Sequence, residues 1–174
     1  AMIPYKGKRR AEGIESLFYR CPSCGTYSAI KAEGNAFRCT SCGASAELDD
    51  YDRICNSRKI PFRYLSQWHL WERNGIDALC KAEDDGKPVF PEDDGVLLMK
   101  LEGHRFKVLS KSFTVITDRK GITIPEKGLR FPFSAISSMV INAKQTIELF
   151  SSNEVYRFRL AKGRSPLKIW ELYN

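Results

Sequence analysis

Hydrophobic residues in the C-terminal half of the chain recur in short runs that are separated by turn-forming residues. Alternation of apolar and polar residues over four to eight positions is typical of β-strands that bury one face. Links such as Asp118-Arg119-Lys120 and Ser152-Asn153 are short enough to join antiparallel neighbours. We predict seven or eight strands, at residues 96–101, 106–109, 113–117, 121–124, 129–133, 138–141, 146–150 and 155–160.

The last segment of the chain has helical rather than alternating spacing. Ser165 can cap the first turn, and Pro166 suits the first helical position. An apolar stripe follows at Leu167, Trp170, Leu172 and Tyr173. An antiparallel sheet that is followed by one amphipathic helix is the element order of a pleckstrin-homology-like barrel, so we predict that fold for residues 95–174.

Another helix is predicted ahead of the sheet, at residues 67–82. Ser66 is placed to cap it, and Leu65 and Leu70 are spaced as a hydrophobic staple. Apolar residues follow at helical spacing, at Trp68, Trp71, Gly75, Ile76, Leu79 and Cys80. We interpret this face as core packing, and a ligand groove or membrane interface lined by tryptophan is the alternative. His69 has no acidic partner at catalytic spacing and is interpreted as a surface or packing residue.

Four of the six cysteines form two copies of a CxxCG motif, and fourteen residues separate Cys24 of the first copy from Cys39 of the second. Two residues between thiolates allow each pair to bind one metal ion from a tight turn, and Gly25 and Gly43 can take the positive φ of such turns. Gly34 and Asn35 lie between the motifs and predict a hairpin that brings them together. The spacing indicates a four-cysteine zinc ribbon, and its ligands are Cys21, Cys24, Cys39 and Cys42.

The zinc ion is predicted to be structural, because four thiolates close its coordination sphere whereas a catalytic zinc keeps one position open. A redox dithiol is the alternative for a single CxxC motif, and two matched copies argue against it. Cys55 and Cys80 lie outside the pattern. We interpret both as small buried hydrophobic residues.

Composition divides the chain further. Residues 81–94 combine acidic clusters with Gly86, Pro88 and Pro91, a composition that cannot continue a helix and has little to bury. Ala1 before Met2 is typical of a cleaved-tag remnant. We predict an α+β chain with a tag remnant and basic linker (1–20), a zinc ribbon (21–50), a connector with one helix (51–82), an acidic linker (83–94) and an antiparallel barrel or sandwich with a C-terminal helix (95–174).

The net charge of +7 is concentrated in the last 80 residues. Residues 95–174 carry 14 basic and 6 acidic side chains, whereas residues 1–80 carry 12 and 9. A basic surplus attracts anionic lipid, nucleic acid or acidic protein, but the small surplus around the ribbon disfavours nucleic acid. The residues that we predict to contact an anionic surface are Lys107, Lys111, Arg119, Lys120 and Arg130.

Several function classes are excluded by the sequence. No apolar run approaches the roughly 18 to 20 residues that span a bilayer, and no signal sequence is present. We therefore expect a cytoplasmic protein that is peripheral at the inner face of the membrane. The chain also lacks a phosphate-binding Gly loop, a GxSxG motif and an interpretable catalytic triad, so no active site is predicted.

Several segments together resemble one protein family. They are residues 3–15, residues 17–22, both CxxCG motifs, the segment Trp68-His69-Leu70-Trp71-Glu72-Arg73, and residues 163–168. Over nearly its whole length the chain is similar to the region that follows the catalytic domain in some bacterial 1-acyl-sn-glycerol-3-phosphate acyltransferase-like proteins. The resemblance implies a C-terminal accessory region of a glycerophospholipid acyltransferase, whose catalytic domain would precede residue 1.

The family's catalysis uses a His and an Asp that are separated by four residues, and neither histidine here fits this pattern. Asn74 stands at the Asp position after His69, and Leu109 stands there after His104. The resemblance therefore implies a non-catalytic region that positions its enzyme at an anionic phospholipid surface or docks on the upstream acyltransferase domain. A nucleic-acid-binding zinc ribbon and a protein-interaction scaffold are the alternatives.

Overall fold

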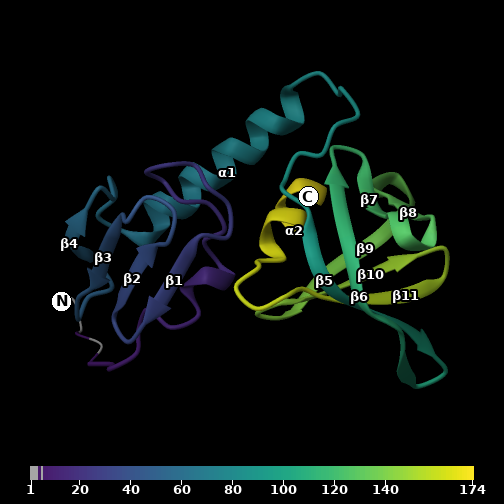
Figure 1. Cartoon of the computed structure of the whole chain (residues 1–174), viewed down its shortest axis with the longest axis horizontal. Coiled ribbons are helices and arrows are strands. Elements are labelled where there is room, and N and C mark those ends of the chain that lie inside the picture. Colours follow the sequence, from purple (N-terminus) through teal and green to yellow (C-terminus); the bar gives the residue numbers. More distant parts are fainter. Residues whose placement is uncertain (1–3, 5) are drawn as a thin grey trace. The chain divides into compact units, whose positions relative to one another are not determined.

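The chain has an α+β fold that divides into two compact units. The computed structural model describes residue 4 and residues 6–174, and the units divide between Gly75 and Ile76. The first unit contains a small antiparallel sheet, and the second contains a larger curled sheet (Figure 1). The helix α1 (Leu65–Lys81) includes the division, and α2 (Leu167–Tyr173) ends the chain.

The sheet of the first unit has four antiparallel strands in chain order. They are β1 (Ile30–Glu33), β2 (Ala36–Cys39), β3 (Ser45–Leu48) and β4 (Ile54–Arg58). The predicted hairpin is confirmed, because β1 pairs with β2 around Gly34, whose φ is 59°. Trp68 of α1 is fully buried, with its ring centroid 4.5 Å from that of Phe18 and 5.5 Å from that of Phe37. Core packing is therefore confirmed for Trp68.

The described part of residues 1–20 belongs to the core of the first unit instead of forming a linker. Ala11, Ile14 and Phe18 are buried, and the 3-10 helix η1 (Ile14–Ser16) lies between them in the chain. The backbone N–H of Ala11 donates to the carbonyl of Gly34 (3.0 Å). The segment was predicted as a linker because of its basic residues, and the spacing of these three apolar residues was overlooked. The tag remnant predicted at Ala1 lies outside the described residues.

The start of α1 differs from the prediction. The helix begins at Leu65, so Ser66 lies inside the first turn, and Gln67 Oε1 accepts the backbone N–H of Tyr64 (3.1 Å). A glutamine that reaches back to the residue before the helix is half of a capping box. The predicted staple is wrong, because the Leu70 side chain is 60% exposed.

The second unit contains a seven-stranded antiparallel sheet in the order β8-β7-β6-β5-β11-β10-β9. The strands are β5 (Asp93–Glu102), β6 (Arg105–Asp118), β7 (Gly121–Ile124), β8 (Leu129–Pro132), β9 (Ile136–Ala143), β10 (Thr146–Ser151) and β11 (Glu154–Arg159), with the 3-10 helices η2 (Pro125–Lys127) and η3 (Phe133–Ala135) between them. Figure 1 shows the sheet curling around its core as a half-barrel. Val96, Leu98, Ile147, Leu149 and Phe158 are among the core residues.

The strands predicted at 106–109 and 113–117 form one strand, β6. The register between β5 and β6 shifts, so that Leu98 pairs with Ser110 while Val96 pairs with Phe113 and Met99 pairs with Val108. Each of these two shifts places one extra residue on β6. The polar residues 110–112 therefore lie within a continuous strand, at and beside these bulges. The alternation of apolar and polar residues did not predict this continuity.

The segment predicted as an acidic linker, 83–94, is attached to the second unit. β5 already begins at Asp93, whose side chain is 1% exposed, and Phe90 is also buried. The N–H of Val89 donates to the carbonyl of Thr117 (2.9 Å). Asp93 is buried because Lys168 Nζ lies 2.8 Å from its Oδ2 atom. One aromatic residue and one ion pair therefore anchor a segment whose composition indicated a linker.

The terminal helix α2 contacts an edge of the sheet. It begins at Leu167, and Ser165 Oγ accepts the Leu167 N–H (3.2 Å), close to the predicted cap. Trp170 Nε1 and the Tyr173 hydroxyl donate to carbonyl oxygens of the edge strand β9, at 3.1 and 3.2 Å. These bonds satisfy edge groups that would otherwise be available to another strand.

Candidate metal centre

Two matched turns bring the four predicted ligands together. In the first turn, the N–H of Gly25 donates to the carbonyl of Cys21 (2.8 Å), and in the second the N–H of Gly43 donates to the carbonyl of Cys39 (3.0 Å). Both glycines have positive φ, 74° and 71°, where a side chain would be strained. The β1–β2 hairpin leads into the second turn because β2 ends at Cys39.

The four sulfur atoms have the spacing of a tetrahedral metal site. All lie within 4.8 Å of one another, and the Cys21–Cys42 and Cys24–Cys39 Sγ separations are both 3.8 Å. Metal–sulfur bonds of about 2.3 Å, as in zinc sites, separate the corners of a regular tetrahedron by about 3.8 Å. A disulfide would need about 2.05 Å. Four thiols at this separation fit one metal ion and no disulfide.

The two sides of the cluster differ in burial and in hydrogen bonding. Burial raises the pKa of Cys21 to about 12 and also raises that of Cys39. The exposed Cys24 forms a hydrogen bond with the Thr26 hydroxyl (Sγ–Oγ1 3.2 Å), and this bond lowers the pKa of the thiol to about 6. A thiolate is the form that ligates metal. The exposed side therefore supplies a thiolate readily, and the buried side is shielded from solvent.

Arg20 supports the first turn, a role that was not predicted from the sequence. Its Nε donates to the carbonyl of Gly25 (3.2 Å), and its guanidinium carbon lies 5.5 Å from the centroid of the Tyr27 ring and 5.1 Å from that of Trp71. Trp68 Nε1 donates to the carbonyl of Arg20 (3.0 Å). The signal was an arginine directly before the first ligand, with tryptophans at helical spacing. Trp71 therefore packs on the arginine that supports the first turn.

The other two cysteines do not have the predicted burial. Cys80 is exposed and Cys55 is half-buried, with Cys55 Sγ 3.5 Å from the carbonyl of Glu47. Cys80 lies in the last turn of α1, outside its apolar stripe, and Cys55 lies on β4, an edge strand of the small sheet. His69 is exposed, as predicted for a surface residue.

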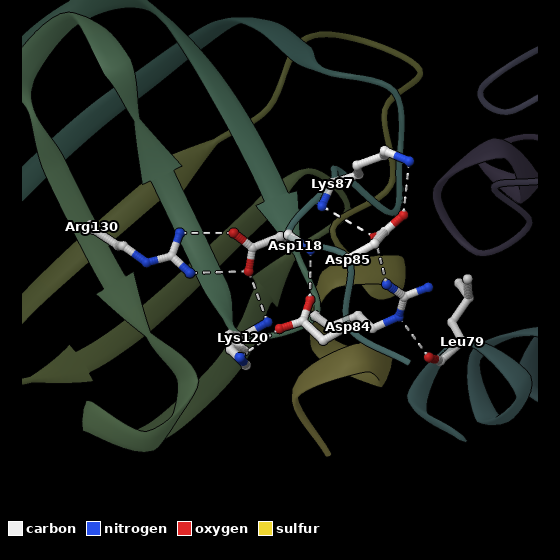
Figure 2. Close-up of polar contacts among 9 residues, drawn as sticks. Leu79, Asp84, Asp85, Lys87, Asp118, Lys120 and Arg130 are labelled. Carbon is white, nitrogen blue, oxygen red and sulfur yellow. Dashed lines mark hydrogen bonds and ion pairs between the residues drawn. The ribbon is translucent and has the colours of Figure 1, made fainter. Parts of the chain in front are cut away.

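The structure divides the five predicted surface cations between two places. Lys107 and Lys111 lie on β6, where Lys107 forms an ion pair with Glu102. Arg119 and Lys120 lie in the turn after β6, and Arg130 lies on β8. Arg130 forms two hydrogen bonds to Asp118, of 2.8 and 3.1 Å (Figure 2). The five residues therefore do not form one continuous basic face.

Two of the basic residues before the first cysteine form ion pairs within the first unit. Arg10 contacts Asp50 through NH1 (3.0 Å) and the carbonyl of Leu48 through NH2 (2.9 Å), with a side chain that is only 6% exposed. Arg9 forms an ion pair with Glu12 (3.0 Å). These two ion pairs neutralise part of the basic charge near the ribbon, which leaves less of it for phosphate contacts.

Comparisons with known proteins add no assignment to this geometry. No family model, curated protein or solved structure matches the chain. Within the described residues, no helix is long and apolar enough to cross a membrane. Among residue 4 and residues 6–174, the four-cysteine cluster is a group that could hold a metal ion.

Proposed function

We propose that this chain is a non-catalytic accessory module in which a structural zinc ribbon precedes a pleckstrin-homology-like domain. The observation that carries the proposal is the closed set of four thiols at tetrahedral spacing. Zinc with four thiolates has no position for water or substrate, so it stabilises a fold and performs no reaction. Elemental analysis of the purified chain tests the proposed zinc ribbon, and we expect one zinc ion per chain.

The second unit supports the pleckstrin-homology-like interpretation in its element order. Seven antiparallel strands curl around one core, and a single C-terminal helix contacts the edge strand β9. A domain of this kind commonly binds a surface instead of a small substrate. We propose that it positions an attached glycerophospholipid acyltransferase, as the resemblance implies, at an anionic phospholipid surface.

The projecting end of the β5–β6 ribbon is the surface that best fits a membrane. Figure 1 shows this end extending beyond the rest of the sheet. On β6, Val108 is 50% exposed and Leu109 is 38% exposed, and Arg105, Lys107 and Lys111 lie around them. Basic residues attract anionic headgroups, while exposed apolar residues enter the interface below them. This combination favours lipid over nucleic acid.

Reversal of the ribbon charges is expected to release the chain from anionic vesicles. Cations near an anionic surface contribute about 1 kcal/mol each, so Lys107→Glu with Lys111→Glu should weaken association at least about tenfold. Flotation with phosphatidylcholine vesicles that contain phosphatidylserine measures this, at salt from tens to hundreds of millimolar. Lys144→Glu with Lys162→Glu changes the net charge equally and should retain binding. Wild-type protein that ignores anionic vesicles at low salt would refute the membrane role.

The isolated chain is expected not to acylate lysophosphatidate. Neither His69 nor His104 has the Asp needed to assist deprotonation of an acceptor hydroxyl. Incubation with lysophosphatidate and either acyl-CoA or acyl carrier protein checks this by the phosphatidate formed. Turnover by the wild-type chain above that of the His69→Ala, His104→Ala variant would contradict a purely accessory role.

A further inference from the structure

A hollow in the second unit brings together three of its cations. Arg119 and Lys120 come from the turn after β6, and Arg130 comes from β8. The hollow has a volume of about 500 Å³ and is lined by Arg119, Lys120, Arg130, Pro132, Phe133 and Ser134. Three cations around one depression, with a hydroxyl among them, are the groups that bind a phosphate-bearing anion.

Carboxylates from one short segment already contact two of these cations. Asp84 Oδ2 lies 2.6 Å from Lys120 Nζ, and Asp85 Oδ1 lies 3.0 Å from Arg119 NH1. Figure 2 shows Asp84 and Asp85 directed toward this turn from the acidic segment between α1 and β5. The hydrogen bond with Lys120 lowers the pKa of Asp84, and the Lys87 backbone N–H lowers that of Asp85 to about 2. Both carboxylates are therefore charged at neutral pH.

The third cation is held differently. Arg130 donates to both oxygens of Asp118 and also to Thr123 Oγ1 (2.8 Å), and Asp118 accepts the Lys120 backbone N–H (2.8 Å). These bonds lie within the folded sheet and its turn, so Asp118 stays when the acidic segment moves. With Asp84 and Asp85 present, three carboxylates face the three cations, and Asp85 also pairs with Lys87 Nζ (3.2 Å). Without them, two positive charges are left over.

The contacts made by the acidic segment are easy to exchange. Residues 83–88 form neither helix nor strand, and the segment is fixed at its end by the bond from Val89 to Thr117. Each pair has one exposed member: Lys120 is 72% exposed and its partner Asp84 25%, and Asp85 is 48% exposed and its partner Arg119 16%. Exposed ion pairs contribute little to stability. An external anion that satisfies the same N–H donors can therefore replace the carboxylates.

We propose that Arg119, Lys120 and Arg130 form a binding site for a phosphate-bearing anion, and that Asp84 and Asp85 compete for two of these cations in the free chain as a displaceable internal ligand. The segment masks the site by competition, because an internal carboxylate lowers the fraction of chains that are able to bind. The site lies at the β6–β7 turn, so it is separate in sequence from the ribbon proposed to contact the membrane.

The test compares two pairs of neutralised carboxylates in the full chain. Asp84→Asn with Asp85→Asn should tighten the binding of pyrophosphate about tenfold, measured by calorimetry, because the mask is removed. The control, Glu83→Gln with Glu92→Gln, changes the net charge equally and should shift affinity by less than about twofold. Lys120→Gln added to the unmasked variant should abolish the gain. Circular dichroism verifies that each variant is folded.

A second arm identifies the source of the phosphate. Phosphatidylcholine vesicles that contain phosphatidic acid are tested in parallel with pyrophosphate. If the Asp84→Asn, Asp85→Asn variant binds only pyrophosphate more tightly than wild type, the ligand is soluble. If it binds only the vesicles more tightly, the ligand is a lipid headgroup. Either result supports the site. No gain in either arm, or an equal gain in the Glu83, Glu92 control, overturns the proposal.

Discussion

Replacement of Cys39 by Ser is expected to unfold the first unit while the second keeps its sheet. The Cys39 sulfur is buried and lies 3.8 Å from that of Cys24, so its loss opens the metal site on its protected side. Structural zinc supplies roughly 10 to 16 kcal/mol in small modules, more than a four-stranded sheet of this size gains from its core. Elemental analysis should find zinc reduced below about a tenth of an equivalent.

Amide resonances separate the two units in this experiment. Those of residues 6–75 should collapse to the dispersion of an unfolded chain, and those of the β5–β11 sheet should stay in place. Cys55→Ser and Cys80→Ser are the matched controls, because neither sulfur belongs to the cluster, and each should retain a full equivalent of zinc. A Cys39→Ser variant that keeps its metal, or a wild-type chain with disulfides between these cysteines, would disprove the site.

The four-cysteine cluster was predictable from the sequence because the signals that form it are local. Two residues between cysteines and a following glycine determine each turn, and Gly34 determines the hairpin that joins the two turns. Arg20 could not be predicted in the same way, because its role depends on Tyr27 and Trp71 meeting around its guanidinium group. Contacts between residues that are distant in sequence leave no periodic signal.

The same limit explains the errors in the fold. Period-two alternation located six of the seven strands of the larger sheet separately, but β6 was divided because its bulges place polar residues 110–112 within a continuous strand. The acidic composition of 83–94 concealed an anchor, since Asp93 is buried only through a lysine 75 residues later in the chain. Several of the cations predicted to contact an anionic surface are likewise paired with carboxylates, among them Lys107, Lys120 and Arg130.

Neutralisation of Asp93 is expected to destabilise the second unit by about 3 to 5 kcal/mol, the cost of removing one partner from a buried ion pair. Lys168 is completely buried, its Nζ lies 2.8 Å from Asp93 Oδ2, and Arg164 Nε lies 3.9 Å from Oδ1. Asp93→Asn leaves two cations without this carboxylate. Urea unfolding, followed by the amide resonances of the second unit, gives the change in free energy.

The pH dependence of the Asp93→Asn variant separates a charge effect from lost packing. Burial already lowers the pKa of Lys168 below 10.5, and loss of the carboxylate lowers it further. The unfolded chain then binds more protons than the folded chain. The loss in free energy of unfolding, relative to wild type, should therefore shrink as pH rises toward 10.5. Lys168→Met added to Asp93→Asn should recover most of the lost free energy of unfolding, because no buried charge is left. The control is Asp94→Asn, at an exposed neighbouring position, which should cost less than about 1 kcal/mol. A deficit that is independent of pH and unrelieved by Lys168→Met would mean that Asp93 acts through packing alone.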